Sequence, residues 1–196
     1  MAEITSISQL NPDGYYTYHD YMTWKFKERV ELFKGAISKI SPSPNRRHQE
    51  VSGFLAIKIY NYLDDKSFKV YTAPFDVRLP ISDKQGKIDT VVQPDICVIC
   101  DLSKLDEQGC NGAPDLVIEI LSPGNSIREM KDKFELYEQS KISEYWIVDP
   151  QKESVIIYSL NGEHQYIGSR PHVLGDKLSS DVLNGLEIDV TSLFVE

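Results

Sequence analysis

The sequence predicts a mixed α/β (α+β) fold with a β-rich C-terminal half. Two long segments carry apolar residues at helical spacing, and short segments rich in β-branched and aromatic residues surround them. With 196 residues, the chain is long enough to bury one sizeable core. We therefore expect a single domain over 1–196, with an N-terminal extension at 1–29, a core at about 30–150 and a C-terminal β-meander at 151–196.

The segment before residue 45 is predicted to contain a short helix and a strand pair. The helix is expected within 18–30, after a turn at Asp13-Gly14. Residues 30–40 resemble two strands that reverse direction near Gly35. The proline-rich run at 41–44 then ends the second strand.

Two amphipathic patterns predict the principal helices, at about 45–63 and 126–140. Their apolar stripes are Val51, Phe54, Leu55, Ile59, Tyr62 and Leu63 in the first, and Ile127, Met130, Phe134 and Tyr137 in the second. Ser126 and Glu129 have the spacing of a capping box at the start of the second helix.

The predicted strands fall on both sides of the second helix. Those before it are expected at 68–73, 75–79, 90–100 and 115–121, and those after it at 144–148, 155–160 and 165–167, with a short extended piece at 186–194. Together with the two helices, they form a mixed central sheet flanked by helices and extended by the meander.

The composition excludes several classes of protein. Hydrophobic residues at 41% and charged residues at 26% argue against disorder, and the apolar runs are far shorter than the roughly 20 residues of a membrane helix. The formal charge of −9 argues against general polyanion binding, although it permits a local basic groove. The first residues show no secretory pattern and only three cysteines occur, so we expect a cytoplasmic protein without a disulfide framework.

Two predicted strands each place a carboxylate where a buried strand should be apolar. Asp95 interrupts the run 91–99, and Glu119 shares one face of 115–121 with Val117. A buried carboxylate is costly unless it is paired, hydrogen-bonded or bound to a metal. Both could form structural ion pairs with Lys or Arg, or both could come together as hard oxygen ligands of Mg²⁺ or Mn²⁺. The spacing leaves the two interpretations open.

Several segments, taken in order, resemble the Uma2 family (DUF820) of the PD-(D/E)XK restriction-endonuclease-like superfamily. They include Val91-Val92-Gln93-Pro94-Asp95, Asp115-Leu116-Val117-Ile118-Glu119-Ile120-Leu121, Lys133-Phe134-Glu135-Leu136-Tyr137 and Glu144-Tyr145-Trp146-Ile147-Val148-Asp149-Pro150. The resemblance starts near Glu31 and covers nearly all of the remaining chain. It implies a restriction-endonuclease-like core, a DNA substrate, Mg²⁺ or Mn²⁺ as cofactor, and a homodimer. By position it assigns Asp95 to the PD element and Glu119 to the (D/E)XK element.

One position departs from the superfamily pattern. Leu121 stands where the pattern usually has a lysine, whose ammonium would orient water and stabilise developing charge. The resemblance supplies Lys133 on the following helix as a substitute. A long side chain at the edge of the buried stripe can reach inward while its stem stays packed. The alternative is a solvated lysine that pairs with Glu129 at i, i+4.

Three further residues are candidates for supporting roles. Glu31 matches an acidic position in an early strand of the family, or else it is a surface glutamate on an edge strand. His48 faces inward on the first helix, either in the site or as a hydrogen-bonded core histidine. Gln93 is predicted to share the face of Asp95, two residues away. By contrast, Cys97 and Cys100 lie at odd separation in one predicted strand, so structural zinc is not expected.

The function expected from these residues is metal-dependent hydrolysis of DNA phosphodiester bonds. Asp95 and Glu119 would hold Mg²⁺ or Mn²⁺, and Lys133 would position water. Two alternatives remain open: a non-catalytic binding or assembly module that retains the nuclease scaffold, which Leu121 and the acidic charge favour, and a hydrolase of a smaller phosphate-bearing substrate. Arg46, Arg47, Arg128, Lys131, Lys133 and Lys141 either line a basic cleft or simply cover solvated helix faces.

Overall fold

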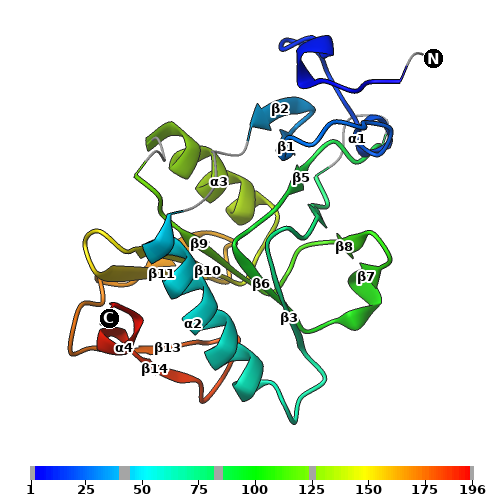
Figure 1. Ribbon diagram of the computed structural model, residues 1–196. Coiled ribbons are helices and arrows are strands. Elements are labelled where there is room, and N and C mark those ends of the chain that lie inside the picture. Colours follow the sequence, from blue (N-terminus) through cyan, green and yellow to red (C-terminus); the bar gives the residue numbers. More distant parts are fainter. Residues whose placement is uncertain (1–2, 40–44, 82–85, 124–126, 195–196) are drawn as a thin grey trace.

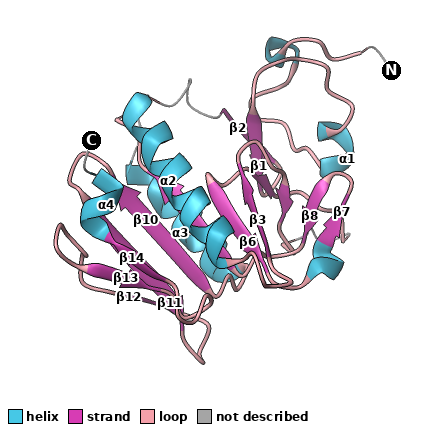
Figure 2. Ribbon diagram, turned by 60° about the horizontal axis from the view of Figure 1, so that its bottom comes forward, coloured by secondary structure: helices cyan, strands magenta, loops and turns pink. Residues whose placement is uncertain are grey.

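The computed structural model describes residues 3–39, 45–81, 86–123 and 127–194. Within these ranges the strands form two six-stranded sheets and one two-stranded pair (Figure 1). Figure 2 shows the two large sheets next to each other, with the small pair and the C-terminal helix at the far end of the central sheet. None of the helices in the described part of the chain is long and apolar enough to cross a membrane.

The elements fall into these sheets as follows. The N-terminal sheet has the order β2-β1-β5-β4-β8-β7 and contains β1 (Val30–Phe33), β2 (Ala36–Lys39), β4 (Val77–Arg78), β5 (Val91–Val92), β7 (Leu105–Asp106) and β8 (Gly109–Asn111). The central sheet has the order β12-β11-β10-β9-β6-β3 and contains β3 (Lys69–Thr72), β6 (Ile96–Ile99), β9 (Leu116–Ile120), β10 (Glu144–Asp149), β11 (Ser154–Leu160) and β12 (Tyr166–Gly168). The remaining elements are the pair β13 (Lys177–Ser179) and β14 (Glu187–Asp189), the helices α1 (Tyr18–Tyr21), α2 (Arg46–Tyr62), α3 (Ile127–Gln139) and α4 (Val190–Phe194), and the 3₁₀ turns η1 (Ile7–Gln9) and η2 (Leu102–Lys104).

The central sheet is mixed, as the sequence predicts. Strands β9 and β10 pair in parallel and are connected through α3, whereas β6 pairs with β9 antiparallel. A parallel pair requires such a crossover, and a helix can provide it on one face of the sheet. This connection places α3 over β9, the strand that carries Glu119.

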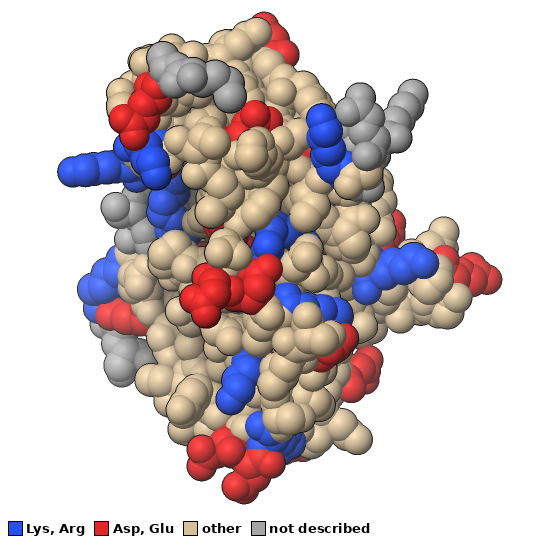
Figure 3. Space-filling view, turned by 90° about the vertical axis from the view of Figure 1, so that its right-hand side faces the viewer, with Lys and Arg blue, Asp and Glu red and all other residues tan. Residues whose placement is uncertain are grey.

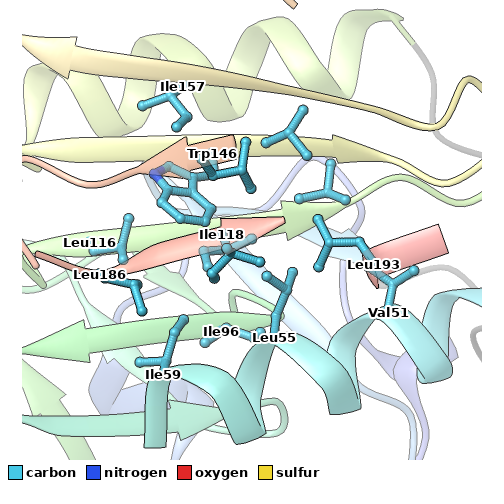
Figure 4. Packing of buried hydrophobic residues seen from close by; sticks show 14 of the residues in the cluster. Val51, Leu55, Ile59, Ile96, Leu116, Ile118, Trp146, Ile157, Leu186 and Leu193 are labelled. Carbon is cyan, nitrogen blue, oxygen red and sulfur yellow. The ribbon is translucent and has the colours of Figure 1, made fainter. Parts of the chain in front are cut away.

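One face of the central sheet packs against α2. Val51, Leu55 and Ile59 recur at helical spacing on α2 and are almost fully buried. They belong to the same cluster as Ile118 of β9 and Trp146 of β10 (Figure 4). This packing confirms the predicted helix, whose first turn Asn45 caps by accepting the N–H of His48.

The opposite face of the central sheet packs against α3. Val117 of β9 and Tyr145 of β10 join Leu136 and Tyr137 of the helix in a second buried cluster. Since side chains alternate along a strand, Glu119 points to the same side as Val117. The alternation predicted for 115–121 is therefore confirmed, and it directs the Glu119 carboxylate toward α3.

Three predicted elements differ from the observed ones. The helix expected within 18–30 is only the single turn α1, which begins after its cap Thr17 and ends at its C-cap, Met22. The residues that follow are not helical, and Trp24 and Phe26 stack on each other there. The strand expected at 90–100 is two strands in different sheets, divided at Pro94, which has no N–H for a ladder.

The third difference is in the C-terminal segment, which was expected to be extended at 186–194. After β14 the chain forms α4, because Val190, Leu193 and Phe194 are buried at helical spacing and Asp189 accepts the N–H of Thr191. Strands β7, β8 and β13 were not predicted. The expected strand pair at 30–40 is confirmed as β1 and β2, joined by Lys34 and Gly35, which both have positive φ. Residue Ser126 of the predicted capping box lies outside the described residues.

Candidate active site

One predicted metal ligand, Glu119, lies in β9, and the other, Asp95, lies directly before the neighbouring strand β6. Strands β6 and β9 pair Ile96 with Ile118, so Asp95 and Glu119 are the next residues along each strand. The main-chain N–H of Ile120 donates to Oδ2 of Asp95 at 2.8 Å, which holds the aspartate against β9. The structure therefore places the two residues in neighbouring positions where the chain passes from one large sheet to the other.

Lys133 reaches this site from α3. Its Nζ lies 2.8 Å from Oε1 of Glu119 and 3.5 Å from Oε1 of Glu31, and only 9% of the residue is exposed. The interpretation of Lys133 as a solvated helix lysine is therefore wrong. The helical stripe turns the lysine inward, and its ammonium is a buried cation between two carboxylates.

Tyr137 also belongs to the site, although the sequence predicted it only as a member of the apolar stripe of α3. Its hydroxyl donates to Oε1 of Glu119 at 2.6 Å, the same oxygen that Lys133 contacts. The signal that could have revealed it is the i, i+4 spacing from Lys133, which places both side chains on one helix face.

Burial and charge oppose each other at this cluster. Burial raises the pKa of Glu119, and the ammonium of Lys133 lowers it. The nearby carboxylates of Asp95 and Glu31 raise it further, and the resulting pKa is about 7. Burial lowers the pKa of Lys133, but the attraction of Glu119 and Glu31 outweighs this and leaves the pKa above its ordinary value. Burial, together with Glu119, raises the pKa of Tyr137 far above the usual range. Lys133 therefore stays charged, and Tyr137 stays a protonated donor.

Glu31 lies within the N-terminal sheet and not on a free edge. Strand β1 is flanked by β2 and β5, and only 4% of Glu31 is exposed. Its Oε1 accepts the main-chain N–H of Gln93 at 2.8 Å and faces Lys133. Of the two interpretations of Glu31, the surface glutamate is therefore wrong.

His48 is buried in the first turn of α2 and contacts Asp95. Its Nε2 lies 3.2 Å from Oδ2 of Asp95, while its buried Nδ1 has no hydrogen-bond partner among the described residues. The carboxylate is an acceptor, so this contact assigns a proton to Nε2. His48 thus donates to a predicted metal ligand.

The side chain of Gln93 does not join the two carboxylates. Its Oε1 accepts two bonds from Arg29, and its Nε2 donates to Asp76 at 2.8 Å and to Tyr21 at 3.3 Å. The break in the strand at Pro94 explains why the face that Gln93 was predicted to share with Asp95 is not continuous. Among the described residues, Gln93 contacts the cluster through its main-chain N–H, which donates to Glu31.

The donor set of this site is compatible with a hard divalent cation. Mg²⁺ is usually held by one or two carboxylates, with water and substrate phosphate completing its shell. Asp95 and Glu119 provide two such groups, and the side chain of Asp95 is 21% exposed. No group of three or more His, Cys, Asp or Glu side chains within residues 3–39, 45–81, 86–123 and 127–194 is arranged to hold an ion alone. Within those residues, the structure thus offers two carboxylates of suitable chemistry but no group of three or more such ligands.

Most of the basic residues proposed for a cleft are paired on the surface. The pairs are Arg46–Glu50, Arg47–Glu153, Arg128–Asp132 and Lys131–Glu135. Figure 3 shows positive and negative side chains interspersed over one face of the molecule. These pairs favour the interpretation of solvated helix faces over a continuous basic cleft.

Comparison with known proteins identifies the family. The model of the family described as "Uma2: Putative restriction endonuclease" matches residues 18–191. The chain belongs to the Uma2 family. It is 24% identical over 151 residues to the uncharacterized protein slr1290 of Synechocystis sp., which is 76% of each chain.

A crystal structure has the same fold. It is described as a "putative nuclease belonging to DUF820" from Anabaena variabilis, and it superposes with a TM-score of 0.70 at 19% identity over 91% of this chain and 97% of that one. This likeness confirms the predicted mixed α/β, nuclease-like fold of this Uma2 protein.

Proposed function

We propose that this Uma2 protein is a metal-dependent endonuclease that hydrolyses phosphodiester bonds in DNA. The observation that carries the proposal is the grouping of Asp95, directly before β6, with Glu119 of β9 and Lys133 of α3. Two carboxylates can hold a divalent cation, and a buried ammonium can stabilise the charge that develops in phosphoryl transfer. Family membership and fold support the same reaction class.

Each residue of the site has a distinct role in this proposal. A divalent cation held by Asp95 and Glu119 would polarise a phosphoryl oxygen and lower the pKa of bound water. Lys133 would hold the attacking water or stabilise the charge that develops on the phosphate, the task that Leu121 cannot perform. His48 and the N–H of Ile120 both bond Oδ2 of Asp95, which fixes the orientation of that carboxylate.

An exposed basic segment next to the site supports a polyanionic substrate. Lys25, Lys27 and Arg29 are exposed and alternate along the chain just before β1, which carries Glu31. The guanidinium of Arg29 contacts a neutral acceptor, Oε1 of Gln93, so this contact does not cancel its charge. Basic side chains in this arrangement suit contacts with DNA phosphates.

A second candidate function is a binding or assembly module without catalysis. The absence of a lysine at Leu121 favours it, and so does the close pairing of Lys133 with Glu119 and Glu31, since such a network can be purely structural. This candidate retains the basic segment and the fold but predicts no turnover.

A cleavage assay separates the two functions. Supercoiled plasmid and single-stranded DNA are incubated with the protein in Mg²⁺, in Mn²⁺ and in EDTA. We expect metal-dependent cleavage that is lost in Asp95→Ala and Glu119→Gln. Lys133→Met should lower the rate by about 10²–10³-fold, whereas Lys131→Met, an exposed lysine of the same helix, should retain it. Cleavage that survives both carboxylate substitutions would refute the proposed site.

A folded protein that binds DNA but is inert with every metal would favour the binding module. The homodimer implied by the family resemblance stays a prediction, which light scattering coupled to size-exclusion chromatography tests directly.

A further inference from the structure

Two donors from the same helix face converge on one oxygen of Glu119. The Nζ of Lys133 lies 2.8 Å and the Oη of Tyr137 lies 2.6 Å from Oε1. The two residues are one helical turn apart on α3, and Tyr137 is fully buried. Both hydrogen bonds therefore go to the same oxygen of the carboxylate, Oε1.

The two donors differ in how firmly they hold the carboxylate. Lys133 has a flexible stem, and its ammonium divides its contacts between Glu119 and Glu31. Tyr137 has one hydroxyl on a rigid ring, which packs edge-to-face against Tyr145 with 5.1 Å between ring centroids. The tyrosine therefore fixes the rotation of the Glu119 carboxylate even when the ammonium moves toward another acceptor.

The other predicted ligand is held in a similar way. The N–H of Ile120 and the ring of His48 both contact Oδ2 of Asp95, at 2.8 Å and 3.2 Å. Among the described residues, the donors to each carboxylate gather on a single oxygen. Such an arrangement is expected where the second oxygen serves another partner, because hydrogen bonds to one oxygen orient the whole planar group.

We propose that Tyr137 is a positioning residue, which turns the Glu119 carboxylate so that Oε2 faces a divalent cation shared with Asp95. The inference rests on the proposed function, because it assumes a metal at these two carboxylates. Tyr137 itself touches neither the metal nor the substrate in this role. Partners of metal ligands commonly change metal affinity by 10–100-fold when they are removed.

The test is a Mn²⁺ titration of the purified full chain by isothermal titration calorimetry, without DNA. Tyr137→Phe removes only the hydroxyl, and we expect Mn²⁺ to bind about 10–100-fold more weakly. Tyr137→Met, a second variant without the hydroxyl, should show a similar loss, so the test stands if one of the two does not fold. In cleavage assays, saturating Mn²⁺ should restore most of the rate, since the positioning acts through metal binding.

Tyr166→Phe is the matched control. Tyr166 lies in the neighbouring aromatic cluster and donates to the carbonyl oxygen of Ile142 at 2.9 Å, so this variant loses one tyrosine hydrogen bond outside the site. It should melt earlier and bind Mn²⁺ like the wild type. A folded Tyr137→Phe with wild-type Mn²⁺ affinity would overturn the inference and leave the proposed nuclease intact. A wild-type protein that neither binds Mn²⁺ nor cleaves DNA would overturn both.

Discussion

The main-chain N–H of Ile120 donates to the side chain of Asp95 at 2.8 Å, just beyond the last paired residues of β6 and β9. A carboxylate thus replaces the carbonyl oxygen that a longer β6 would have offered. The bond has two consequences: it satisfies a buried N–H at the end of the ladder, and it holds Asp95 next to Glu119. Asp95 therefore contributes to both the stability of the sheet and the site.

Substitutions of Asp95 should separate these two contributions. Asp95→Asn keeps an acceptor for Ile120, whereas Asp95→Ala leaves that N–H unsatisfied, which typically costs about 1–3 kcal/mol. We expect Asp95→Ala to be less stable than Asp95→Asn by this amount in urea unfolding, although both lose metal-dependent cleavage. Equal stability of the two variants would show that the hydrogen bond contributes little.

Removal of the Lys133 ammonium should strongly destabilise the protein. Lys133→Met would leave the buried carboxylates of Glu31 and Glu119 close together without a cation. Breaking a buried ion pair in this way typically costs about 3–5 kcal/mol. Lys131→Met, on the exposed face of α3 with Glu135, should change the free energy of unfolding by less than about 1 kcal/mol. Similar unfolding curves for the two variants would contradict the role assigned to Lys133.

The stability contributed by Glu119 should depend on pH. Its pKa is raised from 4.5 to about 7, so the folded state holds the proton more tightly than the unfolded state. The contribution is fully present below about pH 4.5 and is lost as the pH rises through about 7. Glu119→Gln lacks this titration, so its stability relative to the wild type should increase over that range. Chemical unfolding of both proteins at several pH values measures the difference, and a constant difference would contradict the prediction.

The sequence predicted the elements whose pattern is long and regular. The α2 stripe and the alternation along β9 are enforced by burial on both faces of the central sheet, so the orientation of Glu119 toward α3 could be read directly from its neighbours. The break between β5 and β6 was not predicted, because apolar residues lie on both sides of the polar segment Gln93-Pro94-Asp95 and resemble one continuous strand. That break decides where the side chains of Gln93 and Asp95 lie.

The hydrogen bond from Tyr137 to Glu119 could not be predicted from the sequence for a different reason. A tyrosine in an apolar helix stripe has the same sequence signature whether its ring only packs or its hydroxyl also bonds a buried carboxylate. The partner, Glu119, is 18 residues away in the chain, and only the crossover through α3 brings the two together. The i, i+4 spacing places Tyr137 beside Lys133 on one helix face, but it does not show that the hydroxyl bonds Glu119.

The basic segment before β1 should contribute to DNA affinity through phosphate contacts. Lys25 and Lys27 are exposed, so Lys25→Ala and Lys27→Ala should weaken binding to duplexes of any sequence, measured in EDTA by fluorescence anisotropy. Each lost phosphate contact should reduce the slope of log K against log salt by about 0.9. Lys177→Ala, which removes an exposed lysine paired with Glu187 on β13 and β14, is the control and should leave the slope unchanged. If all three variants keep the wild-type slope, DNA does not contact the segment before β1, and its lysines are only solvated charges.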